Sequence, residues 1–287
     1  MDYVSKRKIW FSIPTVIIIF GFIFLIFNGL NYGIDFAGGT IIHIDLHRTF
    51  EVEDIKEITD SFDSSADITY AGEDRDQVII QTQISITEGQ RNDLFKGFQE
   101  KFNIKEKDML SIDQVDPIIG SELRNQALVG ILIAIVAMLI YISIRFEISF
   151  AIAAIIALAH DMLILLSFFA ILRIQVNAPF IAAMLTVLGY SINDTIVVFD
   201  RIRENRKKVK KLELEELINS SISQSLMRCI NTSVTTLFTI IALYIFGVEA
   251  VKSFALPLII GFVAGTYSSI FIASPIWYII KNRKVHA

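Results

Sequence analysis

The chain has 287 residues, of which 53% are hydrophobic, and its mean hydropathy of +0.56 is too high for an ordinary soluble protein. The net charge of −4 identifies no partner, because the charged residues are distributed very unevenly along the chain. A single cysteine, Cys229, excludes an intrachain disulfide, and we expect it to be a buried apolar residue. The sequence has no Walker loop, no GxSxG or GxGxxG motif and no zinc-ligand spacing. Nothing in it therefore points to nucleotide hydrolysis or to nucleic acid, and we expect no cofactor.

Six stretches of the chain are long and apolar enough to cross a bilayer, which takes about 20 residues. The first is predicted at 9–30, directly after the basic residues Lys6, Arg7 and Lys8. Its apolar run is too long for a signal peptide and no small-residue cleavage site follows, so we predict an uncleaved span. The other five lie within 127–280, at about 127–144, 148–171, 178–199, 230–247 and 253–280.

Lysine and arginine residues in the flanks of the spans predict the orientation of the chain. They gather in residues 1–8, in the loop 200–229 and in the tail 281–287, whereas the short loops on the other side carry only Arg173 and Lys252. We therefore expect both ends in the cytoplasm and residues 31–126 outside. Within the loop 200–229, apolar residues at helical spacing favour an amphipathic helix on the membrane surface. They are Leu214, Leu217, Ile218, Ile222 and Leu226.

Residues 31–126 hold 20 acidic and nine basic residues, a net charge of −11, and are expected to form a soluble extracytoplasmic domain. Apolar periodicity predicts strand 40–46, helix 52–62, strands 67–71 and 77–83 joined by a turn at 72–74, helix 94–102 and strand 109–115. The order β-α-β-β-α-β is that of the ferredoxin-like fold, an α+β arrangement. Because this fold hosts many functions, it indicates none by itself.

The acidity of this domain has two interpretations. It is the solvated face of an outer domain, or it belongs to a mobile domain that contacts a polypeptide. His43, Asp45 and His47 on one strand face leave a metal site as a further alternative. An iron–sulfur site is excluded, because there is no cysteine cluster.

Ionisable residues lie inside the predicted spans, where they are costly and by default mark a pathway or a relay. His160 and Asp161 lie in the third span, Asn193 and Asp194 in the fourth, and Arg228 at the start of the fifth. Apolar residues flank Asp194 for two turns on both sides. We therefore interpret Asp194 as a functional carboxylate.

Helical spacing arranges these residues in stripes. Tyr190, Asn193, Asp194 and Val197 share one face of the fourth span, and Arg228, Thr232, Thr235 and Thr239 share one face of the fifth. We expect Arg228 to pair with ionised Asp194 and to be released on protonation, because a buried pair broken on one side costs several kcal/mol. Two alternatives stay open: Arg228 contacts phosphates at the membrane surface, and His160 with Asp161 forms only a local structural bond.

Three stretches carry a resemblance to a known family. NYGIDFAGGT, residues 31–40, is similar to the signature that opens the SecD/SecF family. ALAHD, residues 157–161, and GYSINDTIVVFDRIREN, residues 189–205, are similar to the SecF branch of that family. The layout of one span, an outer domain and five further spans matches over the whole chain. The resemblance implies a six-helix α bundle of the RND superfamily with the ferredoxin-like domain inserted after the first span.

The resemblance also implies a function and a set of partners. Members of this family pair with SecD, associate with the SecYEG channel in the bacterial plasma membrane, and promote export after SecA-driven insertion, with YajC and YidC as further partners. Proton or sodium flow is thought to move the outer domains. The resemblance assigns ion coupling to Asp194 and Arg228. The polar residues of the spans add Asn193 to this site and suggest a relay through His160, Asp161 and Thr232. The family motif supplies Gly33, Asp35, Phe36, Gly38 and Gly39.

Two glycine pairs also have a plain structural interpretation. Gly38 and Gly39 lie where the chain turns from the first span into a strand, and glycine tolerates the positive φ of a tight turn. A hinge between span and domain is compatible with that turn. Gly261 and Gly265 form a GxxxG pattern in the sixth span, which is typical of close helix packing but weakly specific.

Two other functions compete with protein export. A half-transporter of the same superfamily that exports small molecules would require larger outer loops than the one in this chain, and an outer-membrane partner. An intramembrane aspartyl protease would use Asp161 and Asp194 as two carboxylates that share a proton. The motifs around them differ from those expected of such enzymes, and Arg228 would keep both acids ionised. We therefore predict that the chain is not an enzyme.

Overall fold

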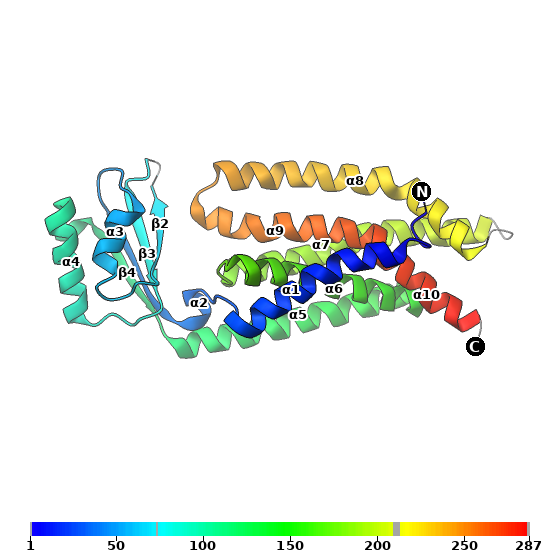
Figure 1. The fold of residues 1–287 in the computed structure, drawn as a ribbon, viewed down its shortest axis with the longest axis horizontal. Helices are drawn as coiled ribbons and strands as arrows, with labels where there is room; N and C mark the ends of the chain where they lie inside the picture. Colours follow the sequence, from blue (N-terminus) through cyan, green and yellow to red (C-terminus); the bar gives the residue numbers. More distant parts are fainter. Residues whose placement is uncertain (1, 73, 209–212, 286–287) are drawn as a thin grey trace.

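The computed structural model describes residues 2–72, 74–208 and 213–285, which form a small domain and a bundle of long helices (Figure 1). Within these ranges six helical stretches are long and apolar enough to cross a membrane. They are α1 (Arg7–Asn28), α5 (Pro117–Arg145), α6 (Ile148–Leu172), α7 (Ala178–Lys208), α8 (Leu214–Phe246) and Val251–Asn282, the last composed of α9 (Glu249–Ser268), η2 (Ser269–Ala273) and α10 (Ser274–Val285). Together with a four-stranded sheet they confirm the predicted fold class. Residue 73 of the predicted turn, residues 209–212 of the predicted loop and residues 286–287 of the predicted tail lie outside the described residues.

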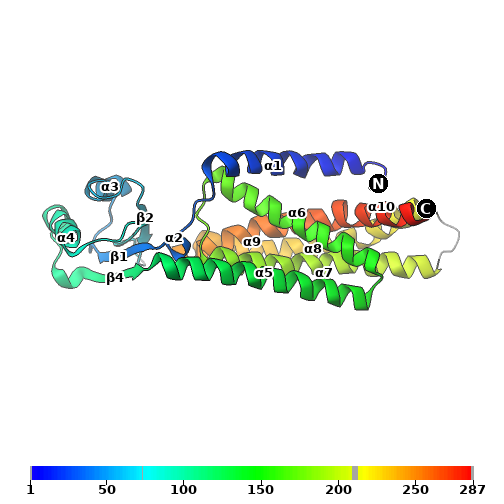
Figure 2. The ribbon, with the colours of Figure 1, turned by 90° about the horizontal axis from the view of Figure 1, so that it is seen from below.

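The bundle is built around α6, α7 and α9. Figure 2 shows α1 on one side of the bundle and α5 on the other, with α6 crossing between them. Both chain ends lie at the end of the bundle that is remote from the small domain (Figures 1 and 2). In the core near these ends, Phe150 of α6 stacks on Trp277 of α10 with a ring separation of 4.4 Å.

The second span was predicted at about 127–144, and the helix that contains it, α5, begins earlier, at Pro117. The side chain of Asp116 accepts a hydrogen bond from the N–H of Ile118 at 2.8 Å, and Pro117 occupies the first turn. This is the chemistry of a helix N-terminus. Hydropathy detects only the apolar part of the helix, whereas the cap sets its first residue.

The surface helix predicted in the loop 200–229 is not a separate element of the structure. α7 continues past residue 199 and α8 begins well before residue 230, so most of this segment consists of extensions of the two helices. Leu217, Ile218 and Ile222 are at most 3% exposed, and they pack in one core with residues that include Tyr3 and Ile202. The apolar stripe is therefore covered by the protein itself rather than by lipid.

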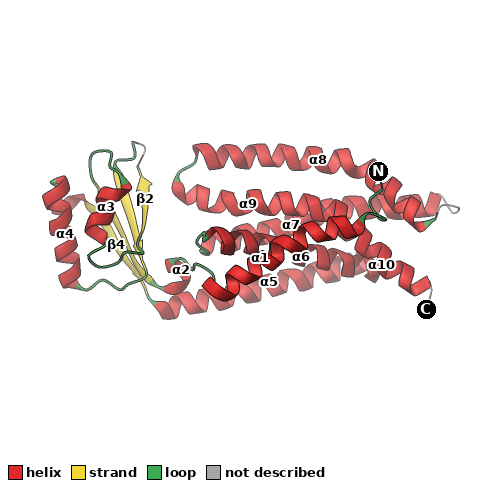
Figure 3. Cartoon of the chain, in the orientation of Figure 1, coloured by secondary structure: helices red, strands yellow, loops and turns green. Residues whose placement is uncertain are grey.

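The small domain is a four-stranded antiparallel sheet with its helices on one face (Figure 3). Its elements are β1 (Gly39–Asp45), α3 (Val52–Thr59), β2 (Asp67–Ala71), β3 (Gln77–Thr82), α4 (Glu88–Phe102), η1 (Glu106–Asp108) and β4 (Met109–Val115), after a short helix α2 (Ile34–Ala37). The sheet order β2-β3-β1-β4 splits each βαβ unit by one strand, as in ferredoxin-like folds. Ile42, Ile44, Val78 and Ile80 are at most 1% exposed in the core that the sheet shares with α3 and α4. The opposite sheet face looks toward the bundle.

The strand face predicted to hold His43, Asp45 and His47 together does not form. β1 ends at Asp45, and His47 lies beyond it with a left-handed φ of 52°. His47 Nε2 is 3.1 Å from Asp108 Oδ1, whereas His43 Nε2 is 2.9 Å from Gln77 Oε1. Across the described ranges no three potential metal-binding side chains are grouped, so the metal alternative has no support.

The sixth span, predicted at 253–280, corresponds to a helical stretch that contains an irregular turn. α9 packs closely on α7, since a Cβ on Gly265 would lie 2.9 Å from Cβ of Ser191, and one on Gly261 would lie 2.3 Å from a methyl carbon of Val187. These contacts account for the GxxxG pattern. After α9 the helix widens into a π-helix turn, η2, a geometry often found at functional sites.

Candidate ion-coupling site

Asp161 lies at the centre of a hydrogen-bonded network between α6, α7 and α9. It is fully buried, and its Oδ1 is 2.9 Å from Nδ1 of His160. The hydroxyls of Ser191 and Ser268 donate to its Oδ2 at 2.6 and 2.9 Å. The carboxylate is thus bound by one residue of its own helix and by one hydroxyl from each of two others.

Asp194 has a separate network between α7, α8 and α9. It is 2% exposed, and Ser233 of α8 donates to its Oδ2 at 3.1 Å. Thr266 of α9 in turn donates to the hydroxyl of Ser233 at 2.7 Å. In the part of the chain that the structure describes, no cation lies within ion-pair distance of Asp194, so its only hydrogen-bond donor is a neutral hydroxyl.

The two networks meet on one face of α7. Ser191, Asp194 and Thr195 are three and four residues apart, which places them on the same side of the helix. The hydroxyls of Thr195 and Ser269 are 2.8 Å apart, and Ser269 also donates to the carbonyl oxygen of Ser191 at 3.3 Å. Ser268 and Ser269, at the junction of α9 and η2, are both fully buried. This junction therefore places one hydroxyl on Asp161 and the next on Thr195, the neighbour of Asp194 in α7.

The predicted pair of Arg228 with Asp194 is absent among the described residues. Arg228 and Asn193 are exposed and Thr232 is half-buried, with its hydroxyl donating to the carbonyl oxygen of Arg228 at 2.8 Å. The residue that reaches Asp194 is Ser233, one position further along α8. The face of α8 that packs on the bundle therefore contains Ser233 and not Thr232, so it lies one position along the helix from the predicted polar stripe. Cys229 lies on that inner face and is 1% exposed, as expected.

Sequence reasoning missed the hydroxyl residues of the site. The site contains five small hydroxyl residues in mostly apolar helices: Ser191, Ser233, Thr266, Ser268 and Ser269. Such residues commonly hydrogen-bond their own helix backbone, as Thr232 does here, so their presence alone indicates no site. Only the packing distinguishes those that bind a carboxylate.

The motif that follows α1 joins the chain to the loop between α6 and α7. The N–H of Gly33 donates to the carbonyl oxygen of Val176 at 2.9 Å, and the N–H of Val176 donates to that of Asn31 at 2.7 Å. Asp35 Oδ2 accepts a hydrogen bond from the N–H of Ala178 at 2.8 Å. Phe36 is 7% exposed in the bundle core. The motif therefore binds the first turn of α7, the helix that carries Asp194.

Gly38 and Gly39 form the turn between this motif and β1. Their φ values are 77° and 142°, in the region that favours glycine. A Cβ on Gly38 would lie 2.7 Å from the nitrogen of Pro117, and one on Gly39 would lie 2.0 Å from the carbonyl oxygen of Thr82. The tight turn alone accounts for both glycines.

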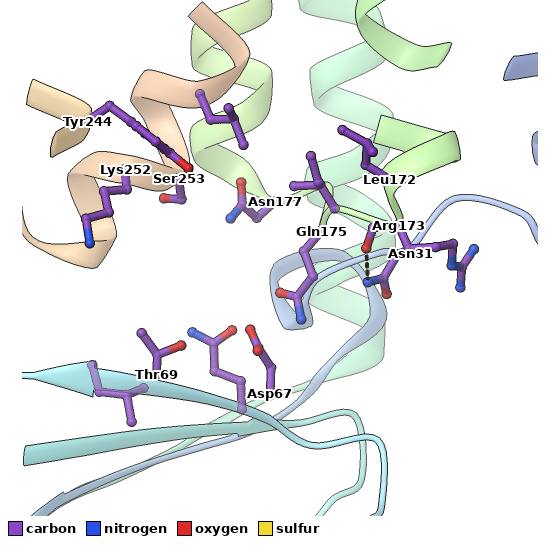
Figure 4. Close-up of a pocket in the computed structure, with 14 residues that line it drawn as sticks. Asn31, Asp67, Thr69, Leu172, Arg173, Gln175, Asn177, Tyr244, Lys252 and Ser253 are labelled. Carbon is purple, nitrogen blue, oxygen red and sulfur yellow. Dashed lines mark hydrogen bonds between the residues drawn. The ribbon is translucent and has the colours of Figure 1, made fainter. Parts of the chain in front are cut away.

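A cavity of about 500 Å³ separates the open sheet face from the end of the bundle. Figure 4 shows Asp67 and Thr69 of β2 pointing toward the bundle, with Gln175 and Asn177 opposite them. The sheet face that looks toward the bundle is therefore not packed on the bundle over its whole area.

Comparison with known families identifies the chain. The family model described as "Protein export membrane protein SecD/SecF, C-terminal" matches residues 96–283, and the "SecD/SecF GG Motif" matches residues 23–44. The chain belongs to the SecD/SecF family. This membership gives it an accessory role in Sec protein translocation, a transport role, and makes it a membrane protein.

Its relatives include both separate and fused SecD/SecF proteins. Protein translocase subunit SecF of Calditerrivibrio nitroreducens is 37% identical over 99% of this chain and 95% of that protein. Protein translocase subunit SecDF of Bacillus subtilis is 35% identical over 99% of this chain, which spans 38% of that protein. The crystal structure of SecDF from Thermus thermophilus superposes with a TM-score of 0.85 and 34% identity over 99% of this chain and 39% of that one.

Proposed function

We propose that this SecF relative uses a proton or sodium gradient to promote the export of unfolded polypeptides through SecYEG, after SecA has driven their insertion. The observation that carries the proposal is Asp194, a buried carboxylate whose hydrogen-bond donor is a hydroxyl and not a cation. An isolated buried charge is costly. Binding of a proton or a small cation would remove that cost, so the occupancy of Asp194 can favour one packing of the helices over another.

The proposed partner is a SecD subunit. Asn193 and Arg228 are exposed and Thr232 is half-buried on α7 and α8, within helices that are long and apolar enough to span a membrane. Polar side chains in a bilayer favour contact with other helices or with a water-filled cavity over lipid. SecDF relatives, which carry the SecF-like region in a longer chain, support the same partner. We expect Arg228 to enter the ion pathway at this interface, and YajC or YidC to bind elsewhere on the complex.

The proposed location is a bacterial plasma membrane with residues 31–126 outside and both chain ends in the cytoplasm. The bundle end that holds both termini also holds Lys281, which pairs with Glu147 at 2.7 Å, and Arg206, which pairs with the same carboxylate at 2.9 Å. Basic residues at this end support a cytoplasmic position.

The proposed transmission route runs along α7. The helix carries Asp194 in its middle and is capped by Asp35 at its first residue, Ala178. A change of helix packing around Asp194 would reach the motif through this contact. The Gly38–Gly39 turn, directly after the motif, is the proposed hinge for the domain, and the adjoining cavity leaves room for its movement.

The competing functions have less support. An aspartyl protease dyad requires two carboxylates that share a proton. Asp161 and Asp194 have separate hydrogen-bond partners throughout the described residues. A half-transporter for small molecules is favoured by no specific feature of the structure, and we propose no catalytic activity.

An export assay tests the proposal. Proteoliposomes that contain SecYEG, SecD and this chain would be supplied with SecA and a secretory protein, with and without an imposed gradient. We expect Asp194→Asn to assemble normally and to lose the stimulation by the gradient. Asp200→Asn is the matched control, because Asp200 lies on the same helix but is half-exposed and paired with Arg203. Normal stimulation in Asp194→Asn would refute ion coupling at this residue.

A further inference from the structure

An apolar cavity of about 340 Å³ lies between α1, α6 and α9, beside the Asp161 network, with which it shares His160. Apolar side chains form most of its wall, among them Ile13 and Ile17 of α1, Phe168 of α6 and Val263 of α9. An apolar protein cavity of about 150 Å³ is large enough to hold benzene. The volume of this cavity is therefore sufficient for an apolar molecule larger than benzene.

Two polar side chains line the cavity, His160 and Tyr267. Pro14 has no backbone N–H, which frees the carbonyl oxygen of Trp10 from the helix ladder of α1. The Tyr267 hydroxyl donates to this oxygen at 2.7 Å, so its hydrogen bond is made inside the protein.

His160 is different. Its side chain is 10% exposed, and its Nδ1 is bonded to Asp161 at 2.9 Å. The other ring nitrogen, Nε2, is buried and has no hydrogen-bond partner within the described residues. An unsatisfied buried polar atom is unfavourable. His160 lines the cavity, but Nε2 itself lies behind the cavity surface, so a ligand hydroxyl reaches it only after a small movement of the ring or of its neighbours.

The depth of His160 restricts what can bind to it. The residue lies in the middle turns of α6, which runs from Ile148 to Leu172 and is long enough to span a bilayer. A charged phospholipid head group stays at the membrane surface and cannot reach this depth. A hydroxyl both donates and accepts a hydrogen bond, so it satisfies Nε2 in either tautomer of the imidazole.

We propose that this cavity binds an uncharged, membrane-soluble alcohol or phenol, with its apolar body between α1 and α9 and its hydroxyl bonded to Nε2 of His160. The bound molecule would be joined to Asp161 through the imidazole, so that it can modulate the buried network. The site itself does not depend on whether the carboxylates carry ions.

The test uses the full chain in lipid nanodiscs, both alone and with its SecD partner, with 4-hydroxybenzophenone as a photoreactive phenol and mass spectrometry of the labelled peptides. We expect saturable labelling of the α6 and α9 peptides that line the cavity. 2-Naphthol should compete about fivefold better than 2-methylnaphthalene, the effect of about one hydrogen bond. In His160→Phe this advantage should vanish.

A second pair of variants separates the cavity from the lipid surface. Ala264→Phe places a ring in the cavity and should abolish the labelling, whereas Ile152→Phe, at an exposed position of α6 outside it, should not. If Ala264→Phe fails to fold, the comparison of 2-naphthol with 2-methylnaphthalene in His160→Phe is sufficient to test the proposal. Unsaturable labelling spread over the exposed helix faces, an equal effect of both competitors on the unmodified chain, or loss of labelling only when SecD is bound would overturn the proposal. The last result would show that a partner helix fills the groove.

Discussion

The carboxylate of Asp35 caps the helix that begins at Ala178, with 2.8 Å between Oδ2 and the backbone nitrogen. The two residues are far apart in the chain, on either side of the small domain and two long helices. Their contact holds the exit of the first span against the start of α7. It gives the acidic residue of the family motif a physical role that does not require a hinge.

Asp35→Ala should therefore destabilise the start of α7. Loss of a helix-capping side chain costs about 1 kcal/mol, which corresponds to a fall in Tm of about 2–4 °C. Thermal unfolding of the detergent-solubilised chain measures this. Asp35→Asn keeps an oxygen acceptor at the same place and should lose less. An equal loss in both variants would contradict the capping role.

Gly39→Ala should be far more damaging than substitution of a glycine with similar backbone strain but open surroundings. The new Cβ would lie 2.0 Å from the carbonyl oxygen of Thr82, so β1 and β3 must separate. Gly29 is the control, because its φ of 63° is also left-handed but a Cβ added to it would meet no heavy atom within 4 Å. Gly29, with φ 63° and ψ −176°, lies in a region that is nearly restricted to glycine, so Gly29→Ala should cost about 1–3 kcal/mol. Similar unfolding temperatures for the two variants would refute the steric argument.

Ser233→Ala and Thr232→Ala distinguish the observed face of α8 from the predicted one. Ser233 donates to Asp194, whereas the half-buried Thr232 hydroxyl donates to the backbone of its own helix. A typical hydrogen bond contributes about 1 kcal/mol, or a factor of about five. We expect Ser233→Ala to change gradient-stimulated export by about that factor and Thr232→Ala to change it less. The reverse order would support the stripe through Arg228 and Thr232.

The pair of His47 and Asp108 makes the small domain sensitive to pH. The hydrogen bond with Asp108 raises the pKa of His47 above its ordinary value of 6.5. The backbone N–H of Lys105, together with the bond from His47, lowers the pKa of Asp108 below 3.8. The stabilisation linked to His47 is complete below pH 6.5 and is lost as the pH rises through the raised pKa. That linked to Asp108 is present above pH 3.8 and is lost as the pH falls through the lowered pKa.

An NMR titration of the histidine-labelled chain in detergent tests this pair, with the His47 signal assigned by its absence in His47→Gln. Asp108→Asn should return the pKa of His47 toward its ordinary value. Asp45→Asn should have a smaller effect on the pKa of His47. Asp45 raises this pKa through its charge, whereas the hydrogen bond of Asp108 is the largest cause of the shift. An unchanged His47 titration in Asp108→Asn would contradict the interaction.

The general fold could be predicted because its signals extend over many residues. Apolar runs of about 20 residues mark spans, and alternation at positions such as Ile42 and Ile44 marks a strand buried on one face. Helix ends were less predictable. The start of α5 depends on the cap at Asp116, which lies outside the apolar run.

The candidate site was only partly predictable. Asp161 and Asp194 were identified because a carboxylate in an apolar helix is costly and conspicuous. The orientation of α8 was not, because neighbouring positions such as Thr232 and Ser233 both carry hydroxyls at helical spacing. The charge of Arg228 drew attention to a face of α8 that is exposed in this chain, whereas Ser233 on the neighbouring face reaches Asp194. The π-helix turn at Ser269 has no sequence signal of this kind.

We propose that Asp194 binds the ion whose gradient stimulates export. The most direct test of this proposal is ion flux into liposomes that contain this chain with SecD, measured with a luminal pH dye under an imposed proton gradient and with a sodium-sensitive dye under a sodium gradient. We expect one of the two gradients to drive an ion flux. Asp194→Asn should reduce this flux to the level of protein-free liposomes, whereas the Asp200→Asn complex should conduct normally. A flux in Asp194→Asn equal to that of the unmodified complex would contradict the proposal.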